Sequence, residues 1–338
     1  MSRNPLHGFR VEHTQIGFIG HDLQRPECIL AEPDGTLWVA DARGGVVRIA
    51  PDGSQQVITP LTQEKALDAS FEARYVEAQG SLPNGLCFDE NDDFIIANWG
   101  TNALEHMTRE GHQRTLYTEI EGQPLGKVNF PLRDSKGRIW FSVTTREEPW
   151  TKQVNSKISD GYIGLIDQKG IRIVAEGFCG TNEIRFDARE EWLYVVESTA
   201  RRITRLRHRN GELHEREVYG PSELEGHPDG FAFDAFGNLW ITLIFLDKLI
   251  AITPEGDVLE LLDDSNPVAN AVYEQHFRAG TLTPEIMAAN HGTLCPWMAS
   301  LTFGGPDLRT VYLGSLRGNR IPYFRSPVPG QPMIHWRH

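Results

Sequence analysis

A short pattern of polar and apolar positions recurs along the chain. Each copy has a polar residue, a short apolar strand, a turn that often contains Asp or Gly, and a second apolar strand. Within a copy, apolar and polar residues alternate over about six positions, which predicts a pair of antiparallel strands. Five copies are clear and a sixth is weaker; they begin at Pro26, Pro83, Val128, Thr181 and Pro228, and near Ser300.

Most copies are followed by a third apolar segment that ends in a Gly-containing turn, as in 45–53, 162–170 and 248–256. With one more outer strand each unit has four strands, and 338 residues divided by six gives about 56 residues per unit. Two independent β-sandwiches would not require the same sequence pattern six times. A propeller does require it, because every sheet must pack in the same way between two neighbouring sheets. The sequence therefore predicts an all-β fold, a six-bladed β-propeller with four-stranded antiparallel blades, formed as one domain by residues 1–338.

Three insertions make the spacing of the copies uneven. They lie near residues 61–80, 144–160 and 263–299, and the last contains a predicted helical turn at 284–289. Long connections in compact domains are usually functional. We therefore expect these segments to be loops over one mouth of the ring.

Composition narrows the classes of function. There are 46 acidic and 33 basic side chains, a net charge of −13, which argues against a nucleic-acid partner because such binding needs clustered Lys and Arg. The 32 Gly and 20 Pro fit many short elements joined by turns. Residues 1–10 lack the apolar region of a secretory signal and no run reaches 18 apolar residues, so we expect a cytoplasmic protein without membrane association. Four scattered cysteines, none in a Cys-x-x-Cys motif, fit buried apolar side chains.

A carboxylate or carboxamide recurs where five of the copies enter their first strand. The first strand of a propeller blade lines the central channel, so these side chains should converge on the axis. Two carboxylates and several amide oxygens at one point would form an all-oxygen cage for a divalent cation. The alternative is that Pro-Asn-Gly and Pro-Asp-Gly act only as turn formers. The five residues are Glu27, Asn84, Asn129, Asn182 and Asp229.

At these residues the chain resembles the senescence marker protein, regucalcin and gluconolactonase family of six-bladed propellers, over nearly its whole length. The phrases that carry the resemblance are Pro26-Glu27, Asn129 ahead of Asp134-Ser-Lys-Gly-Arg138, Thr181-Asn182, Pro228-Asp229-Gly230 with Gly237-Asn-Leu-Trp240, and 300–305 (SLTFGG). The family hydrolyses sugar lactones and related esters in a metal-dependent reaction.

The resemblance implies a role for each matching residue. Glu27, Asn182 and Asp229 would be direct metal ligands, and Asn129 a metal or substrate ligand. Asp229 would also be the general base. Three further positions concern the substrate: Lys127 stands where the family has an Arg, Glu183 stands where some relatives have Gly, and Asn84 has counterparts in bacterial but not animal members.

The chemistry expected of this cage is metal-activated hydrolysis of a small lactone or related cyclic or aryl ester, with a carboxylate taking the proton of the attacking water. Ca²⁺ is the favoured cation, and Zn²⁺, Mn²⁺ or Mg²⁺ also accept such ligands. The sequence has no Gly-x-Ser-x-Gly elbow, HExxH motif or phosphate-binding loop. Two alternatives remain: a non-catalytic propeller that binds a cation or small ligand, and a strictosidine-synthase-like propeller without a metal cage.

Other residues have simpler interpretations. His227 is taken for a surface loop residue, with substrate contact or proton relay as the alternative. Trp99 and Trp150 are expected in the core or in an apolar lid. The basic segment 201–209 is interpreted as a solvated strand edge rather than a nucleic-acid patch.

Overall fold

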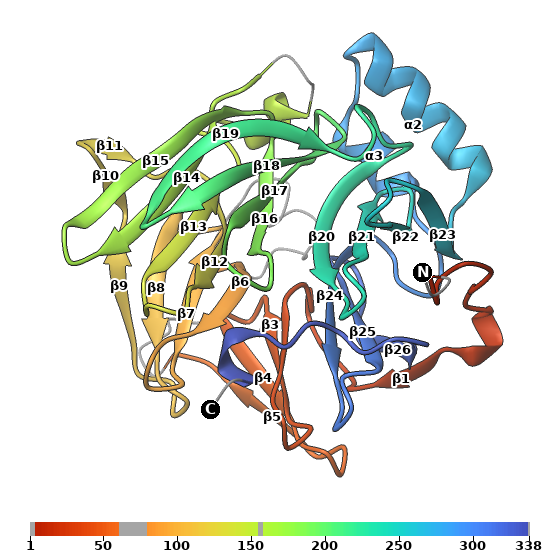
Figure 1. Ribbon diagram of the computed structural model, residues 1–338, viewed down its shortest axis with the longest axis horizontal. Coiled ribbons are helices and arrows are strands. Elements are labelled where there is room, and N and C mark those ends of the chain that lie inside the picture. Colours follow the sequence, from red (N-terminus) through yellow and green to blue (C-terminus); the bar gives the residue numbers. More distant parts are fainter. Residues whose placement is uncertain (1–3, 61–79, 155–157, 337–338) are drawn as a thin grey trace.

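Strands that follow one another along the chain form six antiparallel sheets of four strands, arranged in a ring (Figure 1). The computed structural model describes residues 4–60, 80–154 and 158–336. The first three sheets contain β2 (Ile29–Ala31), β3 (Leu37–Asp41), β4 (Gly45–Ile49) and β5 (Gln55–Ile58); β6 (Pro83–Phe88), β7 (Phe94–Asn98), β8 (Ala103–Met107) and β9 (Gln113–Tyr117); and β12 (Val128–Arg133), β13 (Ile139–Val143), β14 (Gly161–Asp167) and β15 (Gly170–Phe178). The next two contain β16 (Thr181–Phe186), β17 (Trp192–Glu197), β18 (Arg202–Arg209) and β19 (Glu212–Tyr219); and β20 (His227–Phe233), β21 (Leu239–Ile244), β22 (Lys248–Ile252) and β23 (Val258–Asp263).

Both ends of the chain contribute to the sixth sheet. Its order is β1 (Gly17–Ile19), β26 (Ile321–Arg325), β25 (Thr310–Ser315) and β24 (Met298–Gly304), so the N-terminal strand is the outermost strand. Gly17 lies opposite Tyr323, and a Cβ atom at Gly17 would come within 2.5 Å of that ring. The predicted six-bladed β-propeller is confirmed, and the pairing of β1 with β26 closes the ring.

Burial falls from the axis to the rim of each blade. The innermost strands β6 and β20 are buried at every position, whereas the outermost β9 and β19 have no buried residue. The inner strands pack against neighbouring blades on both faces, so apolar side chains on either face contribute to the core. Polar residues on an inner strand are therefore buried as well, and each needs a partner or a ligand.

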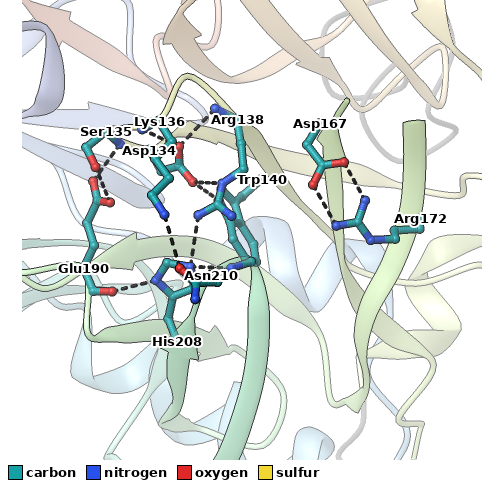
Figure 2. A network of polar contacts seen from close by, with 11 residues as sticks. Asp134, Ser135, Lys136, Arg138, Trp140, Asp167, Arg172, Glu190, His208 and Asn210 are labelled. Carbon is teal, nitrogen blue, oxygen red and sulfur yellow. Dashed lines mark hydrogen bonds and ion pairs between the residues drawn. The ribbon is translucent and has the colours of Figure 1, made fainter. Parts of the chain in front are cut away.

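The turn between the first two strands of blade three binds blade four (Figure 2). Asp134 accepts hydrogen bonds from Arg138 Nε at 2.6 Å and from Trp140 Nε1 at 2.8 Å. Ser135 donates its backbone N–H and its hydroxyl to Glu190 of blade four, at 2.7 and 2.6 Å. The Asp-Ser-Lys-Gly-Arg phrase is thus a structural contact between blades.

The three predicted insertions differ in how much of each the structure describes. Residues 61–79 of the first lie outside the described residues, as do 155–157 of the second. The third forms α2 (Pro267–Ala279) and α3 (Pro284–Ala289), beside β20–β23 in Figure 1. The predicted turn at 284–289 is confirmed as α3. A small hairpin pairs β10 (Glu119–Ile120) with β11 (Gln123–Pro124).

All four cysteines are free thiols: Cys28, Cys87 and Cys295 are buried, and Cys179 is half-buried. In the described ranges, no helix combines the length and apolar character required to cross a membrane.

Candidate functional site

A one-residue bulge interrupts the innermost strand of five blades close to its start. In β20 the pairing shifts between Pro228 and Phe231, and matching shifts occur in β6, β12, β16 and β24. A bulge redirects the side chains near it. The residues that directly follow the last position paired before the shift are Asn84, Asn129, Asn182, Asp229 and Ala299.

Glu27 occupies the matching place in the first blade, two residues ahead of β2. The sequence placed the weak sixth copy near Ser300, but the strand begins at Met298, so Ala299 matches Asp229. Five blades therefore present an oxygen-bearing side chain at this level, and the sixth presents a methyl group.

These five polar residues line one pocket of about 570 Å³, part of it open to solvent. Each is at least nine-tenths buried. The structure thus brings together the predicted Glu27, Asn84, Asn129, Asn182 and Asp229. The pocket is also lined by Arg25, Trp99, Thr144, Trp150, Gln153, Val154, Ser198, Thr199, His227, Ile244, Phe245 and Leu316.

One side of the pocket is held by Arg25, which the sequence analysis did not single out. Its Nη1 lies 3.2 Å from Glu27 Oε2 and donates to the carbonyl of Pro83 at 2.9 Å, and its Nη2 donates to Asn84 Oδ1. The Asn84 amide nitrogen donates to Glu27 Oε1 at 2.8 Å and to the carbonyl of Asn129 at 3.1 Å. Glu27 is therefore held by Arg25 of its own segment and by Asn84 of β6.

On the other side, Asn182 and Asp229 face each other. The Asn182 amide nitrogen contacts Asp229 Oδ1 and lies 3.2 Å from Ser198 Oγ. The side-chain carbonyl oxygens of Asn129 and Asn182 are both buried without a hydrogen-bond partner among the described residues. Because buried polar atoms normally have partners, two such oxygens in one pocket are suited to ligate a bound group.

The carboxyl groups of Glu27 and Asp229 both have raised pKa values. Burial raises the pKa of Glu27 to about 7, although Arg25 opposes the shift. Burial, Glu27 and Glu183 raise the pKa of Asp229 well above its ordinary value. A divalent cation would relieve this repulsion, because an adjacent positive charge favours the ionised form of a carboxyl.

The donor set fits a hard cation. Two carboxylates and two unpartnered amide oxygens, from Glu27, Asp229, Asn129 and Asn182, are the ligand types that Ca²⁺ prefers, and Mn²⁺ or Mg²⁺ accept them. These four donors come from four different blades, and all of them line the same pocket.

His227 is buried in the pocket wall, so its interpretation as a surface loop residue was wrong. Its Nδ1 lies 3.0 Å from the carbonyl oxygen of Ser198, and its Nε2 lies 2.9 Å from Arg201 Nη2. Burial, with the charge of Arg201, lowers the pKa of His227 well below its ordinary value. The imidazole is therefore neutral near pH 7, and it can donate to the Ser198 carbonyl and accept from Arg201 without carrying charge.

Arg201 links this wall to α2. It is 2% exposed, which corrects its interpretation as part of a solvated strand edge. Its Nη1 donates to Glu274 Oε2 at 2.9 Å, and its guanidinium lies 4.2 Å from the ring centre of Phe277. Because α2 supplies both partners, the helix of the third insertion stabilises the side of the pocket that carries His227.

We expect Glu274→Gln to lower the free energy of unfolding by about 1–2 kcal/mol, because it leaves the buried Arg201 without a counter-charge. Glu223→Gln is the matched control, since Glu223 pairs with Arg278 at 3.9 Å and both side chains are more than half exposed. Its effect should stay within about 0.5 kcal/mol. Denaturant unfolding of both variants measures the difference, and equal effects would contradict a structural role for the α2 ion pair.

The outer part of the pocket is apolar. Trp99 and Trp150 meet edge to face with ring centres 5.5 Å apart, and Phe245 and Leu316 contribute to the same wall. The sequence left both core packing and an apolar lid open for the two tryptophans; both are buried in one apolar cluster and both line the pocket. A small ligand with one polar and one apolar side would match the pocket.

Two predicted substrate-binding residues lie outside the pocket lining. Lys127 is buried just before β12, with Nζ 3.3 Å from Glu148 Oε1, and burial lowers its pKa. Glu183 lies deeper on the axis and accepts hydrogen bonds from Ser300 Oγ at 2.5 Å and Arg185 Nη2 at 3.0 Å. Their roles in substrate binding stay predictions.

A second acidic group lies away from the pocket, where β6 turns into β7. Asp89 Oδ2 and Asp93 Oδ2 lie 3.2 and 3.7 Å from His106 Nε2. The three residues could hold a metal ion, although their side chains also serve the turn: Asp89 Oδ1 accepts the backbone N–H of Asn91 at 2.8 Å. The sequence analysis did not identify this group.

Comparison with known proteins gives a family match. A model described as the SMP-30/gluconolactonase/LRE-like region matches residues 67–272. A putative sugar lactone lactonase of Bacillus subtilis is 21% identical over 236 residues, covering 69% of this chain and 68% of that protein. An uncharacterised protein of Sulfolobus acidocaldarius is 29% identical over 143 residues, 41% of this chain; the match spans about half (49%) of its length.

Solved structures share the architecture. A gluconolactonase from Xanthomonas campestris superposes with a TM-score of 0.63 at 18% identity, covering 92% of this chain and 88% of its own. The calcium-binding protein regucalcin from Agrobacterium tumefaciens gives a TM-score of 0.66 at 16% identity, covering 95% of this chain and 98% of its own. At these identities the likeness shows a common fold.

Proposed function

The chain belongs to the SMP-30/gluconolactonase/LRE-like family, and from this premise we propose that it is a metal-dependent hydrolase of a lactone or a related cyclic or aryl ester. The observation that carries the proposal is the pocket in which Glu27, Asp229 and the unpartnered amide oxygens of Asn129 and Asn182 come together. The lactonase and gluconolactonase named among the relatives support the reaction class.

These four residues would hold the cation, with Ca²⁺ favoured and Zn²⁺, Mn²⁺ or Mg²⁺ as alternatives. When bound, the cation supplies a Lewis acid that polarises the ester carbonyl and lowers the pKa of water. Arg25 and Asn84 keep Glu27 in position, and Ser198 does the same for Asn182. The chain's own contribution is thus an ordered set of donors that needs little reorganisation during the reaction.

Asp229 is the proposed general base. It removes a proton from the water that adds to the carbonyl carbon, and it returns the proton to the ring oxygen when the C–O bond breaks. The product is a hydroxy acid. Ser198 and Arg201 occupy both ring nitrogens of His227, so the neutral imidazole holds the pocket wall near Asp229, while the apolar wall of Trp99 and Trp150 excludes water.

The test is a panel of sugar lactones, alkyl lactones and aryl esters, assayed with protein freed of metal and then reloaded with Ca²⁺, Mn²⁺, Mg²⁺ or Zn²⁺. We expect hydrolysis of at least one lactone class to disappear on metal removal and to return on reloading. Cation binding without hydrolysis of any member of the panel would contradict the enzymatic proposal and favour a non-catalytic binding protein.

A further inference from the structure

A second pocket, of about 810 Å³, lies at the opposite mouth of the channel. The first pocket is lined by residues at the start of the innermost strands, and the second by residues at their ends, such as Leu132, Arg133 and Phe186. The two pockets therefore open at opposite ends of the axis. Neither the family match nor the proposed reaction accounts for the second.

The C-terminal segment 326–336 crosses this mouth, from β26 toward the first blade in Figure 1. Its backbone binds blade five, where Gln331 N–H donates to the carbonyl of Phe233 at 2.8 Å. Its end binds blade one, where Trp336 Nε1 donates to the carbonyl of Ala31 at 2.7 Å. Residues 331–335 form one wall of the pocket, so the segment shapes a site instead of filling it.

Arg133 is the side chain in this pocket that can bind an anion. It ends β12, is 9% exposed, and its Nε and Nη2 are both buried without a hydrogen-bond partner in the described part of the chain. These two nitrogens form one edge of the guanidinium, the edge that grips two oxygens at once. Arg43 uses the same edge on Asp41, with Nε and Nη2 at 2.7 and 2.8 Å from its two oxygens. Arg133 presents this fork with no carboxylate in it.

Arg185 also lines the pocket, but its charge is paired with the carboxylate of Glu183. Its Nη2 donates to Glu183, its guanidinium lies 5.3 Å from the ring centre of Phe130, and its Nε is buried without a partner among the described residues. His335 also lines the pocket, but burial lowers its pKa, so it stays neutral near pH 7. The uncompensated charge that can bind an anion therefore comes from Arg133.

Two acidic side chains, Asp187 and Glu190, line the pocket as well. Both hydrogen-bond other groups, within the β16–β17 turn or in blade three. Asp187 Oδ1 accepts the backbone N–H of Glu191 at 2.8 Å. Glu190 accepts two hydrogen bonds from Ser135 of blade three. Neither acid therefore occupies the Nε and Nη2 edge of Arg133 in the described part of the chain.

We propose that this far pocket binds a small carboxylate anion with an apolar group. The two oxygens of the carboxylate occupy the Nε and Nη2 edge of Arg133, and the apolar group contacts Leu132, Phe186, Phe303 and Met333, which line the same cavity. A carboxylate matches the flat fork better than a monatomic ion, and the apolar walls exclude a strongly hydrated one.

The experiment measures binding of butyrate by calorimetry to the metal-free protein at fixed ionic strength, with phosphate and chloride as separate arms. Wild type should bind butyrate saturably. Arg133→Gln should weaken binding at least about tenfold, and Arg133→Lys should weaken it too, since a lysine keeps the charge but loses the fork. Thermal unfolding of both variants without ligand checks the fold, and Arg133→Gln should be as stable as wild type, because it removes a buried unpaired charge.

Two controls separate this site from its surroundings. Arg189→Gln removes an exposed charge from the turn that carries Asp187 and Glu190, and it should bind butyrate as wild type does. Asp229→Asn should also retain binding, so the result is independent of any hydrolytic activity. The proposal is overturned if butyrate does not bind saturably, or if it binds Arg133→Gln as tightly as wild type. Binding of phosphate but not butyrate would overturn the choice of a carboxylate.

Discussion

Replacing Asp229 by asparagine is expected to lower kcat for lactone hydrolysis by about 10²–10⁴-fold, the usual contribution of a positioned general base. Asparagine keeps the size of the side chain and can still meet Asn182, but it cannot take a proton from water near neutral pH. The fold should survive, because the carboxyl is buried among groups that raise its pKa, and the neutral amide avoids that repulsion.

The matched control is Asp257→Asn, an exposed acid in the same blade, which should leave kcat unchanged. Steady-state kinetics at saturating cation, with calorimetric cation binding alongside, separate loss of the base from loss of the metal. If Asp229→Asn binds the cation and keeps kcat within about threefold of wild type, Asp229 is not the base.

The metal-free protein should lose stability as the pH rises from about 4.5 to about 7. The pKa of Glu27 is near 4.5 in the unfolded chain and about 7 in the folded protein, so the folded state binds more protons over this range. Stability from this group is therefore complete below pH 4.5 and is lost as the pH passes 7. One pKa unit corresponds to about 1.4 kcal/mol, so the loss is on the order of 3 kcal/mol.

The comparison with Glu27→Gln measures Glu27 together with its repulsion of Asp229, whose pKa it raises and which shifts stability in the same direction. His227 changes stability in the opposite direction, because its lowered pKa adds stability as the pH rises, but it is present in both proteins. Denaturant unfolding from pH 4.5 to 8 should show the difference between wild type and Glu27→Gln falling steadily. Ca²⁺ should restore wild type most strongly at pH 8. A difference that is flat with pH would contradict the raised carboxyl pKa values described for the pocket.

The convergence of the polar residues on one pocket could be predicted because the signal for each lies in its local sequence. Glu27, Asn182 and Asp229 each sit in a short phrase at a strand entrance, and the repeat shows that these entrances meet on the axis. Register explains the weak sixth copy: its strand begins earlier and places Ala299, a residue without a polar signal, at the equivalent position.

Contacts between distant segments could not be predicted in the same way. Arg201 meets Glu274 across 73 residues of sequence, and neither residue carries a pattern that points to the other. Arg25 and Arg133 are single arginines whose burial follows only from the packing of neighbouring blades. The signal for α2 was present, since Asn266 caps the helix and Pro267 opens it, but Val268 and Val272 face solvent and blur the amphipathic pattern.

The pairing of β1 with β26 also determines when the fold can be completed during synthesis. The first strand ends at Ile19 and its partner begins at Ile321, so β1 leaves the ribosome long before the strand it needs exists. Blades one to five can form in order, each from neighbouring segments, but the sixth must wait for almost the entire chain. Early translation products therefore carry an open ring with an unpaired edge, which makes them candidates for chaperone binding until the last strands arrive.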